Sequence, residues 1–123
     1  MAGLDKQTPI PTEIKLHQQS KLMEISFNDG ATFKLPYEYL RVHSPSAEVR
    51  GHGVGQETLQ TGKRNVEIKS IAAVGNYAVQ PTFSDDHDTG IYSWDLLYDL
   101  GFNHESYWQA YLARLAAADG SRD

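Results

Sequence analysis

Two alternating runs joined by a tight turn place the strongest restriction on how this chain can fold. In each run apolar and polar residues alternate, and Asn28-Asp29-Gly30 between them supplies residues that tolerate a positive φ. An alternation with a period of two is typical of a half-buried strand, so the segment predicts a β-hairpin. The apolar positions are Met23, Ile25, Phe27, Phe33 and Leu35.

Alternation elsewhere predicts further strands. Residues 10–17 form one such run, and residues 66–71 form another in which a bulge near Ser70 would keep one face buried. Residues 77–83 contain Pro81, which cannot donate to a ladder. We therefore expect that strand to lie at an edge or to be irregular there.

Helices are predicted at three places. Pro36 ends the third strand and begins a short helix, Ser93 caps a helix that Gly101 ends, and Asn103 caps a helix over residues 104–118. The last helix carries an aromatic and aliphatic stripe at helical spacing, which predicts a core-facing side. The stripe consists of Tyr107, Trp108, Tyr111, Leu112 and Leu115.

These elements predict an α+β fold, a small twisted and mainly antiparallel β-sheet of about five strands with two C-terminal helices. One domain spans residues 10–118, and residues 1–9 and 119–123 are expected to be tails. Residues 44–65 are rich in glycine and contain few large apolar residues, which predicts a long loop with a function.

Composition restricts the partners. A formal charge of −5 argues against nucleic acid, whose affinity for proteins comes largely from Lys and Arg. No apolar run is long enough for a signal peptide or a membrane span. Cysteine is absent, which excludes disulfides and thiolate sites. We expect a cytoplasmic protein whose partner is another protein or a small anionic ligand, with no contact to nucleic acid or membrane.

A basic cluster lies in the middle of the chain. Arg41, Arg50, Lys63 and Arg64 outnumber the acidic residues near them. Guanidinium and ammonium groups bind carboxylate or phosphate, so this cluster is a candidate anion-binding site, and a solvated surface is the alternative.

His87 is the other candidate, because it stands among three aspartates in the turn Asp85-Asp86-His87-Asp88. Nearby carboxylates are expected to raise the pKa of the imidazole and could attract a divalent cation weakly. A solvated turn is the alternative. A Ser-His-Asp group could combine Ser44 or Ser46 with His87 and Asp88, but neither serine lies in a nucleophile elbow.

The chain resembles the gamma-butyrobetaine hydroxylase-like N-terminal domain over about residues 10–101. Three segments carry this resemblance: Leu40-Arg41-Val42-His43-Ser44-Pro45-Ser46-Ala47-Glu48-Val49, Val74-Gly75-Asn76-Tyr77-Ala78 and Ser84-Asp85-Asp86-His87-Asp88-Thr89-Gly90-Ile91-Tyr92-Ser93-Trp94. The resemblance implies a small, mostly β domain. In this family the domain occurs alone in bacteria, ahead of the oxygenase domain of carnitine-synthesis hydroxylases, and attached to ATPases that carry iron–sulfur clusters.

The resemblance also implies a zinc site, which this chain has lost in part. In the hydroxylases three cysteines and one histidine bind the zinc. The histidine matches His87, whereas Ser44, Ser46 and Val49 occupy the cysteine positions. Serine hydroxyls are poor zinc ligands and valine is none. His43 and His52 could join His87 in a substitute site. Asp86 also replaces a glycine common in the turn.

No reaction is implied for this chain. An iron and 2-oxoglutarate oxygenase needs two histidines and a carboxylate as iron ligands, and one histidine and the carboxylate usually occur together as His-x-Asp or His-x-Glu. No histidine in this chain has an acidic residue two positions later. We therefore expect a non-catalytic accessory or protein-interaction module without a cofactor, a weakly bound divalent metal being the exception. A metal-handling or metal-dependent protein that uses His87 and nearby acids is the alternative, and an anion-binding module is the second.

Overall fold

Two antiparallel sheets of three strands each form the β part of the chain in the computed structural model, which describes residues 8–50 and 58–123. The first sheet has the order β1 (Pro11–His17), β2 (Leu22–Phe27), β3 (Thr32–Pro36). The second has the order β4 (Ile68–Val74), β5 (Ala78–Phe83), β6 (Tyr92–Ser93). Helices α1 (Tyr37–Val42) and α2 (Ala47–Arg50) follow the first sheet, and α3 (Trp94–Phe102) and α4 (His104–Ala117) follow the second. The predicted α+β class and its C-terminal helices are confirmed, whereas the strands are divided between two sheets.

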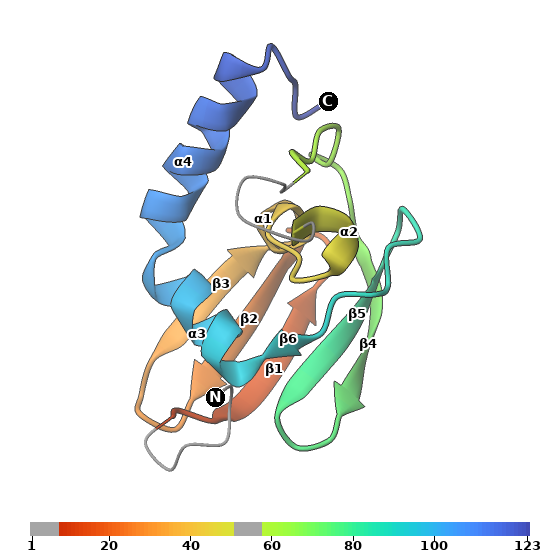
Figure 1. The fold of residues 1–123 in the computed structure, drawn as a ribbon. Helices are drawn as coiled ribbons and strands as arrows, with labels where there is room; N and C mark the ends of the chain where they lie inside the picture. Colours follow the sequence, from red (N-terminus) through yellow and green to blue (C-terminus); the bar gives the residue numbers. More distant parts are fainter. Residues whose placement is uncertain (1–7, 51–57) are drawn as a thin grey trace.

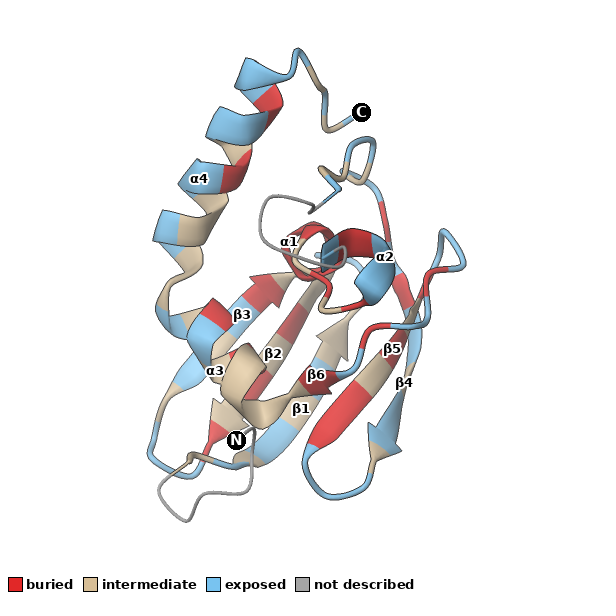
Figure 2. Cartoon of the chain, viewed as in Figure 1, coloured by how far each residue is buried: buried red, intermediate tan, exposed pale blue. Residues whose placement is uncertain are grey.

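The predicted hairpin is confirmed as β2 and β3. Ile25 pairs with Phe33, and Gly30 in the turn has a φ of 93°. Met23, Ile25 and Leu35 are fully buried, as the alternation requires. Buried and partly buried residues alternate along β2 (Figure 2), and the buried residues of both sheets form one core cluster with residues of α1 and α3.

A polar bridge joins the two sheets. The side-chain amide of Gln18, in the β1–β2 turn, donates to the carbonyl oxygen of Ile68 at 3.0 Å. The Tyr37 hydroxyl donates to the same amide's oxygen, also at 3.0 Å. β3 ends at Pro36 and leads directly into α1, and within residues 8–50 and 58–123 no main-chain ladder joins the two sheets.

The second sheet confirms the bulge, since the β4–β5 register shifts between Ile68 and Ser70. β5 is its central strand in the sheet order, so the expected edge position holds only locally, at Pro81, where β5 pairs with β4 alone. The proline is tolerated because β6 pairs only with Ala78 and Val79, and Pro81 lies beyond that short strand.

Helix α3 covers the first sheet and passes through Gly101 (Figure 1). A Cβ at Gly101 would lie 2.3 Å from the ring of Phe33 on β3. The glycine therefore permits a close helix–sheet contact and does not end the helix, contrary to the sequence prediction. Ser93 caps α3 as predicted, since its hydroxyl accepts from the Leu96 amide at 3.2 Å.

Helix α4 extends away from the sheets, and Tyr111 and Leu115 on its inner side are buried with Val42. The side chain of Asn103 does not cap α4 but donates to Asp99 at 2.8 Å. No helix within the described ranges is long and apolar enough to cross a membrane.

The C-terminal residues return to the domain and lie along residues 62–64. The Gly62 amide donates to the Ser121 carbonyl oxygen at 3.0 Å, and the Arg64 amide donates to that of Arg122 at 2.9 Å. Arg122 also binds the buried carboxylate of Glu38 with two hydrogen bonds, of 2.8 and 2.7 Å. This ion pair connects the end of the chain to α1.

Candidate functional site

Ser44 and His87 meet in a buried corner where the α1–α2 connection packs against the β5–β6 turn. Ser44 Oγ lies 2.8 Å from His87 Nε2, and the Ser46 amide donates to the same hydroxyl at 3.2 Å. The two side chains are almost inaccessible, with 0% of Ser44 and 7% of His87 exposed. We call these two residues, with Ser46 and Thr89, the serine–histidine corner.

Thr89 extends the corner toward the surface. Its hydroxyl donates to the Glu48 carboxylate at 2.6 Å and lies 2.9 Å from Ser46 Oγ. Ser46 Oγ in turn accepts from the Glu48 amide at 3.1 Å, which stabilises the first turn of α2. Hydrogen bonds between side chains thus fix α2 against the β5–β6 turn.

Three neighbouring residues, Gly90, Tyr92 and Asp86, shape the chain around the corner. A Cβ at Gly90 would lie 2.5 Å from Ser44 Oγ, so only glycine allows this close approach. The buried Tyr92 donates to the Leu40 carbonyl oxygen at 2.6 Å, and burial raises the pKa of its hydroxyl. Asp86 adopts a φ of 68°, a left-handed backbone conformation that favours glycine.

The electrostatics of His87 are opposite to the sequence expectation. Burial lowers the pKa of the imidazole, and the positive charge of Arg41 lowers it further, while Glu48 and Asp85 act in the other direction. Asp86 is next to His87 in the sequence but does not offset these effects on the imidazole, because its side chain is 94% exposed. The expected raised pKa was therefore wrong, since a neighbour in sequence is not always a neighbour in space.

The basic residues do not converge on one site. Arg41 Nε and Lys63 Nζ donate to the same Asp85 oxygen, at 3.0 and 2.6 Å, and Arg64 is paired with Asp123. Although burial acts to raise it, the hydrogen bond from Lys63 and the charge of Arg41 hold the pKa of the Asp85 carboxyl below its ordinary value. Lys63 and Arg64 line a pocket near the C-terminal residues, whereas Arg50 lines a different pocket beside α3 and α4.

The donors at the corner do not fit the zinc that the family resemblance implies. Ser44 Oγ and His87 Nε2 are directly hydrogen-bonded to each other, and Val49 offers no donor atom. Zinc in structural sites is usually bound by four good donors. His43 turns elsewhere, because its Nδ1 lies 2.9 Å from the Tyr39 carbonyl oxygen, and His52 lies outside the described residues. In the described part of the chain, no three His, Asp or Glu side chains form a group that could hold a metal ion.

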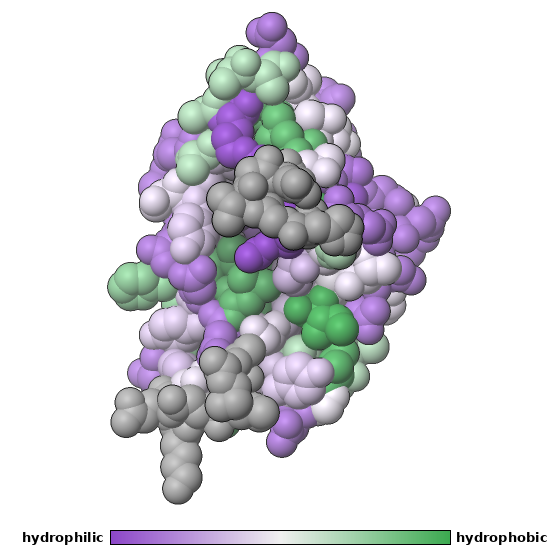
Figure 3. All heavy atoms as spheres, in the orientation of Figure 1, coloured by the Kyte–Doolittle hydropathy of each residue, from purple (hydrophilic) through white to green (hydrophobic). Residues whose placement is uncertain are grey.

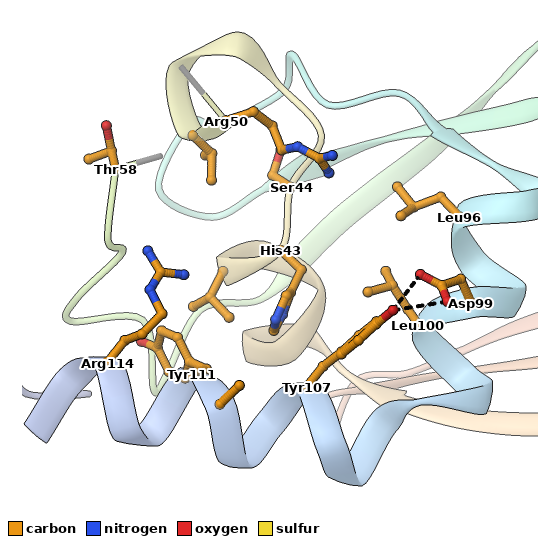
Figure 4. Close-up of a pocket in the computed structure, with 13 residues that line it drawn as sticks. His43, Ser44, Arg50, Thr58, Leu96, Asp99, Leu100, Tyr107, Tyr111 and Arg114 are labelled. Atoms are coloured by element: carbon orange, nitrogen blue, oxygen red, sulfur yellow. Dashed lines mark hydrogen bonds between the residues drawn. The ribbon is translucent and has the colours of Figure 1, made fainter. Parts of the chain in front are cut away.

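A pocket of about 380 Å³ lies beside the corner, between α2, α3 and α4 (Figure 4). Arg50 and Arg114 line it together with His43, Asp99 and Tyr107. The Tyr107 hydroxyl donates to both Asp99 oxygens, each at 3.0 Å. Reasoning from sequence assigned Tyr107 to the core-facing stripe of its helix and did not identify Asp99 or Arg114 as site residues. No local signal in the sequence connects these residues, since they meet only when α3 and α4 pack.

Comparison with known proteins identifies the family of this chain. The family model described as gamma-butyrobetaine hydroxylase-like, N-terminal, matches residues 14–98, more than half of the chain. No curated protein matches the chain significantly.

Several solved structures are similar to this chain over most of their own length. One structure determined by NMR in solution is 53% identical, covers 96% of this chain and 88% of its own, and has a TM-score of 0.82. A second NMR structure is 45% identical, with coverages of 94% and 91% and the same TM-score of 0.82. A crystal structure from Acidithiobacillus ferrooxidans ATCC 23270, described as a protein of unknown function in the DUF971 family, is 40% identical, with coverages of 74% and 91% and a TM-score of 0.63. The chain therefore belongs to the gamma-butyrobetaine hydroxylase-like N-terminal domain family.

Proposed function

We propose that this protein is a non-catalytic accessory domain that contacts another protein, and that the serine–histidine corner takes the place of a metal site in holding its fold together. The observation that carries the proposal is the 2.8 Å hydrogen bond between Ser44 Oγ and His87 Nε2. Each atom satisfies the other, at positions where the hydroxylase relatives are expected to have a cysteine and a histidine that bind zinc.

Burial supports a structural role for the corner. With 0% of Ser44 and 7% of His87 exposed, a substrate carbonyl has no access to the hydroxyl, although the pair resembles two members of a catalytic triad. Asp88 is exposed and uses its carbonyl oxygen to accept from Gln80 at 2.6 Å. Among the described residues, the Asp88 carboxylate forms no hydrogen bond with the His87 imidazole, so the arrangement lacks the third member of a triad.

Exposed apolar side chains on the surface support a role in protein contacts. Phe102, at the end of α3, is 74% exposed, and Ile91 beside the corner is 44% exposed. Aromatic residues are enriched in protein interfaces. The absence of cysteine also remains consistent with a reducing cytoplasm as its location.

Metal analysis tests this proposal. The protein, purified without chelator, is expected to contain far less than one equivalent of zinc, iron or manganese. A variant with Ser44→Cys, Ser46→Cys and Val49→Cys is expected to bind about one equivalent of zinc, because three thiolates then join His87. Adding His87→Ala to that variant should abolish tight binding. Stoichiometric metal in the unmodified protein that His87→Ala removes would overturn the proposal and establish the metal-handling alternative.

A further inference from the structure

The pocket between α2, α3 and α4 combines charged side chains with an apolar floor. Its volume, about 380 Å³, is at the lower end of the range for small-molecule sites. Val42, Val49, Leu96 and Leu100 supply apolar surface from three different helices. Figure 3 shows hydrophobic surface in the hollow between α3 and α2, bordered by hydrophilic side chains.

Two arginines reach this pocket from opposite walls. Arg50 extends from α2 and Arg114 from α4 (Figure 4). Within residues 8–50 and 58–123, neither guanidinium forms an ion pair or hydrogen bond with a carboxylate, whereas the side chains of Arg41, Arg64 and Arg122 each bind one. The charges of both pocket arginines act on His43 between them and contribute to lowering the pKa of its imidazole, after the larger effect of burial.

The remaining polar groups set the charge that a ligand should carry. Asp99 is already bound by the Tyr107 hydroxyl and the Asn103 side chain, and it offsets one of the two guanidinium charges. The imidazole of His43, with its lowered pKa, is neutral near pH 7 and uses Nδ1 to bind the Tyr39 carbonyl oxygen at 2.9 Å. The described lining thus keeps one net positive charge.

We propose that this pocket binds a small organic monocarboxylate, with Arg50 and Arg114 holding the carboxylate and the apolar floor holding the rest of the molecule. A guanidinium fork matches a carboxylate in geometry and charge. The excess of a single positive charge favours a monoanion over phosphate, and the apolar floor favours a ligand with a hydrocarbon body. This site goes beyond the accessory role, since it involves neither metal binding nor a partner protein.

An NMR titration tests the site, with benzoate as the probe and benzamide as its neutral counterpart at constant ionic strength. Benzoate is expected to cause saturable shifts of the Arg50 and Arg114 side-chain signals and of the Leu96 and Leu100 methyl groups, with a dissociation constant of about 1 mM. Benzamide has the same ring without the charge and should bind at least about tenfold more weakly.

Matched variants complete the test. Arg50→Gln and Arg114→Gln should each weaken benzoate binding about tenfold, and Arg64→Gln, an exposed arginine outside the pocket, should not change it. The amide spectrum of each variant checks that the fold is intact. Equal binding of benzamide, tighter binding of inorganic phosphate, unchanged binding in both pocket variants, or no saturable shift would each overturn the proposal. None of these results depends on metal content, so this test and the metal assay can fail separately.

Discussion

Ser44 and His87, which are 43 positions apart in the sequence, share a hydrogen bond of 2.8 Å inside the domain. One partner comes from the segment after α1 and the other from the β5–β6 turn. The pair therefore connects the segment after α1 to the second sheet, and in the described part of the chain no main-chain hydrogen bond joins these two segments.

Ser44→Ala should lower the free energy of unfolding by about 1–3 kcal/mol, because it leaves His87 Nε2 and the Ser46 amide without their partner in a buried place. Urea denaturation measures this loss. Thr89→Val is the control, since its hydroxyl lies nearer the surface, and should cost less than about 1 kcal/mol. Equal losses of stability in the two variants would contradict the claim that the buried Ser44 hydroxyl contributes more to stability than the Thr89 hydroxyl.

Stability should fall as the pH drops below the ordinary histidine pKa of 6.5. The folded state lowers the pKa of His87, so the unfolded chain takes up a proton first, and the stabilising contribution that is complete above 6.5 is lost toward the folded-state pKa. The slope from this group should not exceed about 1.4 kcal/mol per pH unit. NMR titration should give a His87 midpoint below 6.5, and His87→Gln should flatten the stability profile. A midpoint above 6.5 would contradict the burial of the ring.

Asp85→Asn should destabilise the domain by about 2 kcal/mol, because Arg41, whose side chain is only 7% exposed, then keeps a buried charge without its partner. In the unmodified protein, the contribution of Asp85 is present above its ordinary pKa of 3.8 and is lost as the pH falls through its lower folded-state value. Asp86→Asn, at a side chain that is 94% exposed, should change the unfolding midpoint little. A similar loss of stability in both variants would show that the buried ion pair contributes no more to stability than an exposed carboxylate.

Arg122→Ala should cost about 2–3 kcal/mol, since the buried Glu38 carboxylate loses both of its hydrogen bonds from the guanidinium. The variant also removes the guanidinium from its position 5.1 Å above the Trp108 ring. The exposed pair of Arg64 and Asp123 provides the comparison, and Arg64→Ala should cost less than about 1 kcal/mol. The double variant Glu38→Gln with Arg122→Ala should recover part of the lost stability, measured by thermal unfolding. If it recovers none, the unpaired buried charge of Glu38 is not the cause of the loss.

Gly101→Ala should destabilise the protein by about 1–3 kcal/mol, although alanine is the better helix former. The added methyl group would lie 2.3 Å from the Phe33 ring, so the helix or the ring must move. In a Phe33→Ala background the same substitution should become neutral or stabilising. Destabilisation of equal size in both backgrounds would show that the ring is not the obstacle.

Elements with a local cause could be predicted from the sequence. The hairpin follows from the alternation and from Gly30, the bulge near Ser70 follows from a change of parity at Ile71, and Ser93 caps α3 through its own hydroxyl. In each case the residues that determine the structure are close neighbours in the chain.

The features that sequence reasoning missed depend on contacts between distant segments. Gly101 resembles a helix stop until Phe33 is packed against it. His87 is flanked by acids in the sequence, but in the fold the charge of Arg41 from α1 also acts on it. The pairing of Arg50 and Arg114 around one pocket requires α4 to be docked. Neither local propensity nor residue spacing contains this information.

A corner built from hydroxyls and an imidazole also responds differently to chemical stress than one built from thiolates. Peroxide oxidises cysteine thiolates stepwise to acids that no longer bind metal, and this chain contains no cysteine for it to attack. In the proposed metal-free role, the bond between Ser44 and His87 likewise requires no zinc from the cell. Such a corner would persist through oxidative damage and metal starvation, conditions that would dismantle a cysteine-bound zinc site.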